Sequence, residues 1–110
     1  MANIDRQARL DESLQYMFTL TLGRNYPEGE VSDTQLQTFL GLVGEYLEGF
    51  TVTHSIGYWK QEQERSFSIS VAGDFRVQSK IVEISNIYKA LYTQEATMLE
   101  IRESGMWRFL

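Results

Sequence analysis

Two aromatic side chains and two carboxylates lie close together in the stretch GYWKQEQERS, residues 57–66. Tyr58 and Trp59 stand at the start of a predicted charged turn, KQEQE (60–64), which carries Glu62 and Glu64. An aromatic face beside a carboxylate attracts a cationic group such as a sulfonium or an ammonium. The alternative interpretation is a solvated turn whose flanking aromatic residues hold the register of two paired strands.

Conventional catalytic signatures are absent from the rest of the chain. The sequence has no GxGxxG, GxxxxGK[ST], HExxH or GxSxG motif. It has no cysteine, which excludes a thiol nucleophile and any cysteine-ligated metal. The single histidine, His54, cannot form a histidine-rich metal site, and its place on the apolar face of a strand predicts a core residue. We therefore expect neither a metal nor a cofactor.

Charge and length limit the remaining classes of protein. A net charge of −5 over 110 residues argues against a basic face that binds nucleic acid. No apolar run approaches the roughly 18 residues of a membrane-spanning helix, and the opening MANIDRQARLDES is too polar for a secretion signal. We expect one cytoplasmic domain over residues 1–110, with a polar lead-in at 1–12, a tail at 103–110 and no nucleic-acid or membrane partner.

The elements of the first half follow from hydrophobic periodicity. Apolar residues alternate from Leu14 to Leu22, which predicts a strand that is buried on one face. Ser32 and Gln35 form a capping-box pattern at the start of an amphipathic helix, and Gly49 is predicted to end it. The apolar stripe of that helix is Leu36, Phe39, Leu40, Val43 and Leu47. Gly41 and Gly44 within it are predicted to allow a close approach to the sheet, and the alternative is a contact with a partner subunit.

The second half continues with a hairpin, a helix and a strand. Residues 50–59 and 66–71 alternate and predict two paired strands on either side of the charged turn. Asp74 is predicted to start a second helix with the stripe Val77, Ile81, Ile84, Tyr88 and Leu91. Residues 95–101 predict a fourth strand with Leu99 and Ile101 on its inner face.

The order β-α-β-β-α-β predicts an α+β, ferredoxin-like fold. Right-handed crossovers then give an antiparallel sheet in the spatial order 4-1-3-2, with both helices on one face. The other face would be bare, and its expected residues are Met17, Thr19, Thr51, Thr53, Trp59 and Met98. Because a partly apolar open sheet is usually covered by another subunit, we expect a homo-oligomer.

The order of elements and the pattern GYW-(turn)-ERSFSIS resemble the phage S-adenosylmethionine (SAM) lyases, long described as SAM hydrolases. In that family a Gly-x-Tyr-type strand end precedes a hairpin and a Glu-basic-Ser/Thr-apolar-polar-apolar strand. The matching residues here are Gly57 and Tyr58, then Glu64 to Ile69. The resemblance covers roughly residues 14–102, but its specific part is about a dozen residues. This hairpin is shorter than the family pattern, so Glu62 is a second candidate for the carboxylate.

The resemblance implies a reaction that needs no protein nucleophile. The substrate's own carboxylate attacks its Cγ and expels 5′-methylthioadenosine, leaving homoserine lactone. By analogy Tyr58 and Glu64 would be catalytic, Tyr58 binding the substrate carboxylate and Glu64 the α-ammonium, while Trp59 and Glu62 would line the substrate site. The resemblance also implies a phage anti-restriction protein, a homotrimer with sites between subunits, and SAM or a conjugate of it as substrate.

Two alternatives come from other classes of protein. The chain could be a non-catalytic module that binds a small ligand or assembles into an oligomer, as many ferredoxin-like domains do. It could also be an enzyme of the dimeric α+β-barrel kind that uses His54 and an enclosed cavity. Only the lyase predicts turnover of a sulfonium compound without an added cofactor. The sequence names no adenine pocket beyond the neighbourhood of Asn25 and Tyr26.

Overall fold

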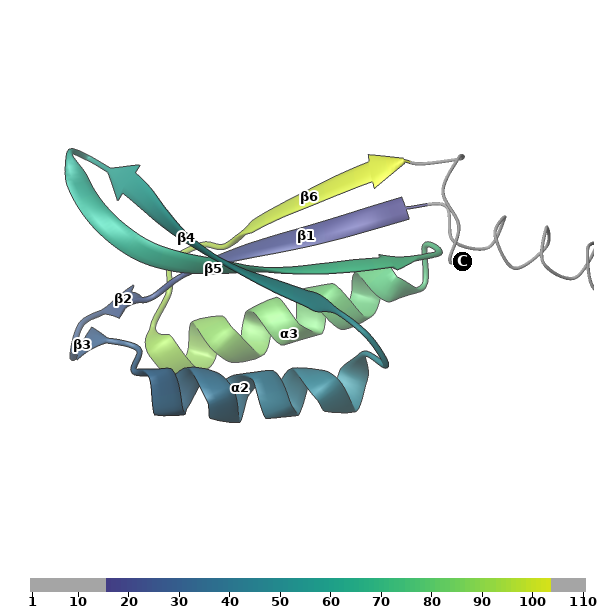
Figure 1. Cartoon of the computed structure of the whole chain (residues 1–110), viewed down its shortest axis with the longest axis horizontal. Helices are drawn as coiled ribbons and strands as arrows, with labels where there is room; N and C mark the ends of the chain where they lie inside the picture. The colour runs from purple at the N-terminus through teal and green to yellow at the C-terminus, as the bar shows by residue number, and fades with distance from the viewer. Residues whose placement is uncertain (1–15, 104–110) are drawn as a thin grey trace, which may run out of the picture.

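Four antiparallel strands form one sheet in the computed structural model, which describes residues 16–103 apart from the Trp59 side chain. The strands are β1 (Tyr16–Gly23), β4 (Thr51–Trp59), β5 (Glu62–Gly73) and β6 (Met98–Glu103), in the order β4-β5-β1-β6. Helices α2 (Asp33–Tyr46) and α3 (Val77–Tyr92) lie on one face of this sheet, as Figure 1 shows. The predicted ferredoxin-like fold and its strand order are confirmed.

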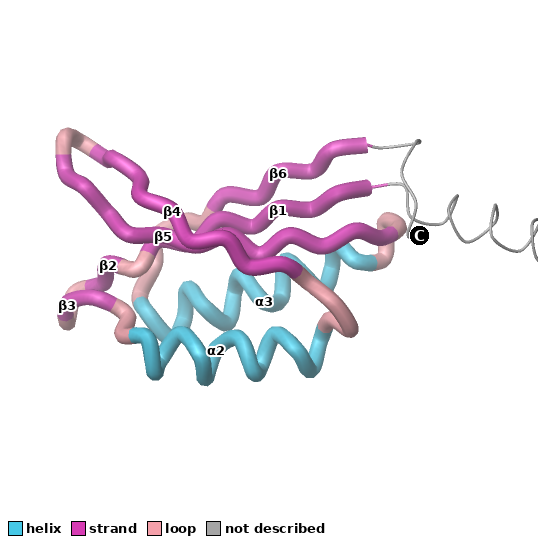
Figure 2. Tube along the Cα trace, in the orientation of Figure 1, coloured by secondary structure: helices cyan, strands magenta, loops and turns pink. Residues whose placement is uncertain are grey.

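A short ribbon lies outside the main sheet, between β1 and α2. Strands β2 (Asn25–Tyr26) and β3 (Gly29–Glu30) pair with each other only. Figure 2 shows this ribbon below the β4–β5 hairpin, next to the first turn of α2. It therefore lies at the same end of the molecule as the residues that the sequence singles out.

The core lies between the sheet and the helices, where the inward residues of β1 and β5 face α2 and α3. Leu20 pairs with Ile69 and Leu22 with Phe67, and all four side chains are buried. The ring of Tyr88 on α3 packs edge-on against Phe67, with ring centroids 5.6 Å apart. Phe39 on α2 packs against the Tyr88 ring as well, with ring centroids 4.9 Å apart. These aromatic contacts join both helices to the central strands.

Helix α2 begins as predicted and ends earlier than predicted. The Ser32 hydroxyl accepts a hydrogen bond from the Gln35 backbone N–H, and the Gln35 side chain accepts one from the Ser32 N–H. The helix stops at Tyr46 and Leu47 is extended, so the prediction that Gly49 ends it is wrong. A buried Leu47 explains this, because the extended residue turns its side chain into the core.

The two glycines within α2 do not serve the close approach predicted for them. A Cβ atom at Gly41 or at Gly44 would meet no neighbouring atom within 4 Å. Both positions are exposed, so no contact with the sheet requires a glycine there.

Helix α3 and strand β6 differ from the prediction at their ends. The helix begins at Val77, and Asp74 instead accepts a hydrogen bond from the Arg76 N–H before it. Leu91 is 58% exposed, whereas Tyr92 is buried, because the apolar stripe continues on the side that faces the Tyr26 and Tyr88 rings. Strand β6 runs from Met98 to Glu103, so it includes the first residue of the predicted tail.

The inner face of β6 is only partly covered. Leu99 is half-buried and packs against the core, as predicted. Ile101 pairs with Phe18 on the same face, yet it is 44% exposed because β6 is an edge strand. The polar lead-in at 1–12, Leu14 and residues 104–110 of the predicted tail lie outside the described residues.

The turn between β4 and β5 is two residues long rather than five. Lys60 and Gln61 both have positive φ, 50° and 68°, as in the tight turns that match the twist of paired strands. Strand β5 already begins at Glu62, so the prediction of a charged turn over 60–64 is wrong for its last three residues. Glu62 and Glu64 are strand residues, and the alternation of the strand decides where their side chains point.

The packing of Phe39 predicts a large loss of stability on truncation. Phe39→Ala removes a buried ring that contacts both Phe67 and Tyr88, and it should lower the free energy of unfolding by about 3–5 kcal/mol. Leu91→Ala, at an exposed apolar position on α3, is the matched control and should change it by less than about 0.5 kcal/mol. Urea denaturation measures both, and equal midpoints for the two variants would contradict the assignment of the core.

Candidate functional site

The Glu64 carboxylate occupies a fixed position on the outer face of the sheet, the face without helices. Its Oε2 accepts a hydrogen bond from the Asn25 backbone N–H at 3.1 Å. Gly23 leaves room for the carboxylate, because a Cβ atom there would lie 2.7 Å from both Glu64 oxygens. On the other side Glu64 pairs with Gly57, which also has no side chain. Two glycines thus flank the carboxylate.

The backbone beneath Glu64 is held from the interior. The hydroxyl of buried Tyr88 donates a hydrogen bond to the Gly23 carbonyl at 2.6 Å. Gln94 donates from Nε2 to the Asn25 carbonyl, also at 2.6 Å. Burial above all raises the pKa of Tyr88, so its hydroxyl keeps its proton and remains a donor. The peptide that anchors Glu64 is therefore fixed on both of its sides.

Hydroxyl side chains cover the outer face next to Glu64. Cross-strand hydroxyl pairs join Thr19 with Ser70 at 3.3 Å, Thr21 with Ser68 at 2.9 Å and Ser55 with Ser66 at 2.7 Å. Within residues 16–103, no lysine or arginine nitrogen forms an ion pair with Glu64. The carboxylate thus stands at the end of a neutral polar surface, with no counter-ion among the residues that the structure describes.

The four predicted site residues divide between the two faces of the hairpin. Glu64 pairs with Gly57, while Tyr58 pairs with Gln63, the next pair along the hairpin. Because successive residues of a strand point to opposite faces, Tyr58 and Glu64 point away from each other within one chain. Glu62 shares the face of Glu64 and is exposed, and Trp59 pairs with Glu62. One chain alone therefore does not bring Tyr58 and Glu64 together.

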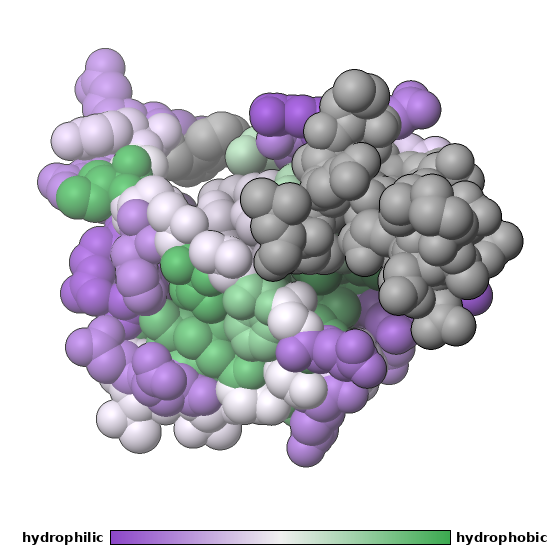
Figure 3. Space-filling view, turned by 45° about the vertical axis from the view of Figure 1, so that its right-hand side comes forward, coloured by the Kyte–Doolittle hydropathy of each residue, from purple (hydrophilic) through white to green (hydrophobic). Residues whose placement is uncertain are grey.

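Tyr58 lies on an exposed apolar part of the hairpin. It is 74% exposed, and Ile56 on the same face is 57% exposed. Figure 3 shows a small hydrophobic patch toward the hairpin end, separated from the apolar area of the main body. The hairpin extends beyond the helices here, so no part of the described chain covers these side chains.

Asn25 and Tyr26, the two residues named for the adenine pocket, have different surroundings. Asn25 contacts Glu64 and Gln94 through its backbone. The Tyr26 ring packs edge-on against Tyr92, with ring centroids 5.3 Å apart, and its hydroxyl accepts a hydrogen bond from Gln35. Only Asn25 therefore borders the carboxylate. Gln94 was not predicted, since nothing in its sequence context marks it.

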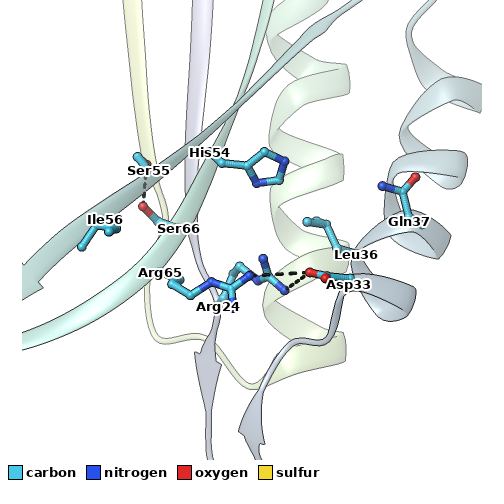
Figure 4. A pocket seen from close by; sticks show the side chains of 9 residues that line it. All are labelled: Arg24, Asp33, Leu36, Gln37, His54, Ser55, Ile56, Arg65 and Ser66. Atoms are coloured by element: carbon cyan, nitrogen blue, oxygen red, sulfur yellow. Dashed lines mark hydrogen bonds and ion pairs between the residues drawn. The ribbon is translucent and has the colours of Figure 1, made fainter.

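A cleft of about 630 Å³ lies on the opposite, helix-bearing side of the same hairpin, between β4–β5 and the start of α2. Figure 4 shows its lining: Arg24, Asp33, Leu36, Gln37, His54, Ser55, Ile56, Arg65 and Ser66. His54 is exposed and lines this cleft, so the prediction of a core histidine is wrong. The reason is that β4 is an edge strand whose inner face is only partly covered by α2.

A buried arginine forms the floor of the cleft. Arg24 is 2% exposed, and it donates from Nε and Nη2 to the Val31 carbonyl and from Nη2 to Asp33 Oδ1. Arg65 is half-exposed and forms ion pairs with Glu30 at 2.8 Å and with Asp33 at 3.6 Å. The sequence analysis missed Arg24, although the alternation Leu20, Leu22, Arg24 already pointed to the inner face.

Arginine neighbours control the ionisation of Asp33. The hydrogen bond and the charge of Arg24 hold its pKa below the ordinary value of 3.8, and Arg65 and His54 contribute in the same direction. The carboxylate itself is exposed while its main partner is buried. Asp33 therefore compensates a guanidinium that would otherwise be buried next to neutral groups.

Two other kinds of site are missing from the described part of the chain. No group of three or more His, Asp or Glu side chains within residues 16–103 is arranged to hold a metal ion. Neither α2 nor α3 is long and apolar enough to span a membrane.

Comparisons with known proteins add a family and a fold. The family model described as "Protein of unknown function (DUF3574)" matches residues 17–109. Among curated proteins no match is found. A solved structure described as "Phage SAM lyase in apo state" is similar with a TM-score of 0.61 and 12% identity, covering 84% of this chain and 82% of that one. A second, "De novo designed protein Foldit4", has a TM-score of 0.49 and 13% identity over 82% of this chain and 96% of that one. At 12% identity the likeness to the first of these structures is one of fold.

We predict that the contribution of Asp33 to the stability of the folded chain is lost in acid. Its pKa is lower in the folded chain than in the unfolded one, so the unfolded state binds more protons as the pH falls below 3.8. The stability that Asp33 contributes is complete at neutral pH and is lost as the pH falls through the folded pKa. Asp33→Asn should therefore unfold at lower urea concentration than wild type at pH 7, and the difference should shrink at pH 2–3.

Glu100→Gln is the control, because Glu100 forms only an exposed ion pair with Arg102. Its urea midpoint should stay close to that of wild type at both pH values. A deficit of Asp33→Asn that is as large in acid as at pH 7 would argue that the carboxylate charge plays no part.

Proposed function

The chain belongs to the DUF3574 family, and we propose that it is a SAM lyase that releases 5′-methylthioadenosine and homoserine lactone. The observation that carries the proposal is the Glu64 carboxylate, anchored by the Asn25 N–H and without a counter-ion among the described residues. The fold likeness to a phage SAM lyase supports the same assignment. The proposal includes the role of an anti-restriction protein that depletes SAM in the cytoplasm of a phage host.

The charge at Glu64 suits a cationic substrate. Holding a half-buried carboxylate in place without a counter-ion costs free energy, and a bound cation offsets that cost. SAM carries a sulfonium and an α-ammonium, and Glu64 binds the ammonium directly or through water. The absence of a side chain at Gly57 leaves space beside the carboxylate for such a group, whereas the carboxylate itself fills the space at Gly23.

The reaction needs only orientation and exclusion of water. The substrate carboxylate oxygen forms a bond to Cγ while the Cγ–S bond breaks, and the electron pair leaves with sulfur as a neutral thioether. No proton, metal or further reactant is required for the balance. Holding the carboxylate oxygen in line with the Cγ–S bond, and removing its water, lowers the barrier by several kcal/mol.

Tyr58 enters the site from a second subunit in this proposal. Its hydroxyl binds the substrate carboxylate, but within one chain it lies on the face opposite Glu64. The exposed Tyr58 and Ile56 side chains suit burial against a neighbouring copy. A homotrimer then supplies Glu64, Glu62 and Trp59 from one subunit and Tyr58 from the next at each site.

Release of 5′-methylthioadenosine tests the reaction. Purified protein incubated with SAM should form it without an added cofactor, as measured by chromatography. Glu64→Gln keeps the shape and removes the charge, so it should lower the rate by roughly 30- to 1000-fold, which corresponds to about 2–4 kcal/mol. Gly23→Ala keeps the charge but forces the carboxylate to move, and it should also lower the rate.

Glu62→Gln is the comparison on the same face, and because Glu62 only lines the site in this proposal, it should lower the rate less than Glu64→Gln does. If Glu62→Gln is inactive while Glu64→Gln is not, the working carboxylate is Glu62. If wild type releases no methylthioadenosine, the lyase proposal is wrong, and the non-catalytic binding module takes its place.

Subunit mixing tests the shared site. The protein should sediment as three chains of 12.8 kDa each. Glu64→Gln and Tyr58→Phe should each be nearly inactive alone, and a mixture that exchanges subunits should recover activity, because some sites then combine an intact Glu64 with an intact Tyr58. A monomer at micromolar concentration, or a mixture without recovery, contradicts the shared site.

A further inference from the structure

The cleft beneath the hairpin gathers two guanidinium groups in a chain whose net charge is −5. Two guanidinium groups, from Arg24 and Arg65, line it against the single carboxylate of Asp33. The imidazole of His54 faces the same space from β4 and adds an N–H donor, as Figure 4 shows. The cleft opens on the helix side of the hairpin, opposite Glu64, and its lining includes none of Tyr58, Trp59, Glu62 and Glu64.

Arg24 is fixed as the base of this cleft. Its side chain is 3% exposed, and Nε and Nη2 are held by Val31 and Asp33. No hydrogen bond joins its Nη1 to any of residues 16–103. A buried donor without a partner is costly, and a bound acceptor removes that cost. The guanidinium is therefore oriented before a ligand arrives.

Arg65, unlike Arg24, is exposed and can change its partner when a ligand binds. Its side chain is 51% exposed, and its partner Glu30 is 41% exposed, so their ion pair exchanges with solvent at little cost. Both arginines approach the same oxygen, Asp33 Oδ1, at 3.0 and 3.6 Å, which places the two guanidinium groups side by side. Paired guanidinium groups offer several parallel N–H donors to one anion.

We propose that this cleft binds the carboxylate or phosphate group of a small organic anion. Arg24 and Arg65 hold the anionic group and His54 donates one further hydrogen bond. The Leu36 side chain provides an apolar contact for the remainder of the ligand. A volume of about 630 Å³ accommodates a ligand of metabolite size. The site is independent of Glu64 and stands whether or not the chain degrades SAM.

Titration of the isotope-labelled protein with inorganic phosphate, and separately with succinate, tests the site by nuclear magnetic resonance. At constant ionic strength, one or both anions should shift the signals of His54, Leu36 and Ser66 in a saturable manner. Tighter binding of phosphate identifies a phosphoryl ligand, and tighter binding of succinate identifies a carboxylate ligand. Absence of saturable shifts with both anions overturns the proposal.

Arg65→Gln should weaken the binding of the preferred anion about tenfold or more, and Arg65→Lys should retain part of it. Arg102→Gln is the matched control, because it removes the same charge from an exposed position on β6 at the outer face. It should change the dissociation constant by less than about twofold. An equal loss in Arg65→Gln and Arg102→Gln means that general charge attraction, rather than the cleft, binds the anion, and the proposal is wrong.

Discussion

The hydrogen bond from the Tyr88 hydroxyl to the Gly23 carbonyl holds the end of β1 against α3. The ring that carries this hydroxyl is buried among Phe39 and Phe67, so both helices and the central strands contribute to its position. Because a buried hydroxyl is costly without a partner, the bond ties the backbone at Gly23 to the core. Both candidate sites extend from this point.

The two sites lie on opposite faces of the sheet because successive side chains of two neighbouring strands, β1 and β5, point to opposite faces. At the end of β1, Gly23 faces the outer side of the sheet and Arg24 the helix side, and the Arg24 N–H still bonds to the Arg65 carbonyl. On β5, Glu64 faces outward and Arg65 inward in the same way. Adjacent residues of each strand thus place the Glu64 carboxylate on one face of the sheet and a pair of guanidinium groups on the other. The outer side favours a cationic group and the inner side an anionic one.

Several elements could be predicted from local patterns. The alternation of Phe18, Leu20 and Leu22 and the capping box at Ser32 and Gln35 depend on neighbours in the chain, and both are confirmed. The strand order followed from the right-handedness of the crossover connections, because almost all such connections are right-handed whatever their sequence. The errors at Gly49, Leu91 and His54 share one feature, because packing between distant elements decided each position: the burial of Leu47, the contact of Tyr92 with the Tyr26 and Tyr88 rings, and the partial cover of β4 by α2.

For the site, the sequence by itself determined the residue types and which of them share a face of each strand. It brought Tyr58, Glu62 and Glu64 into one hairpin, and continuing the same alternation would have separated Tyr58 from Glu64. Only the tertiary structure decided that Asn25 and Gly23 cradle Glu64 and that Gln94 supports them, since these contacts span 39 to 69 residues. It also decided that Arg24 is buried and that His54 is exposed. Periodicity specifies which face a side chain takes, whereas the packing of distant elements decides what that face meets.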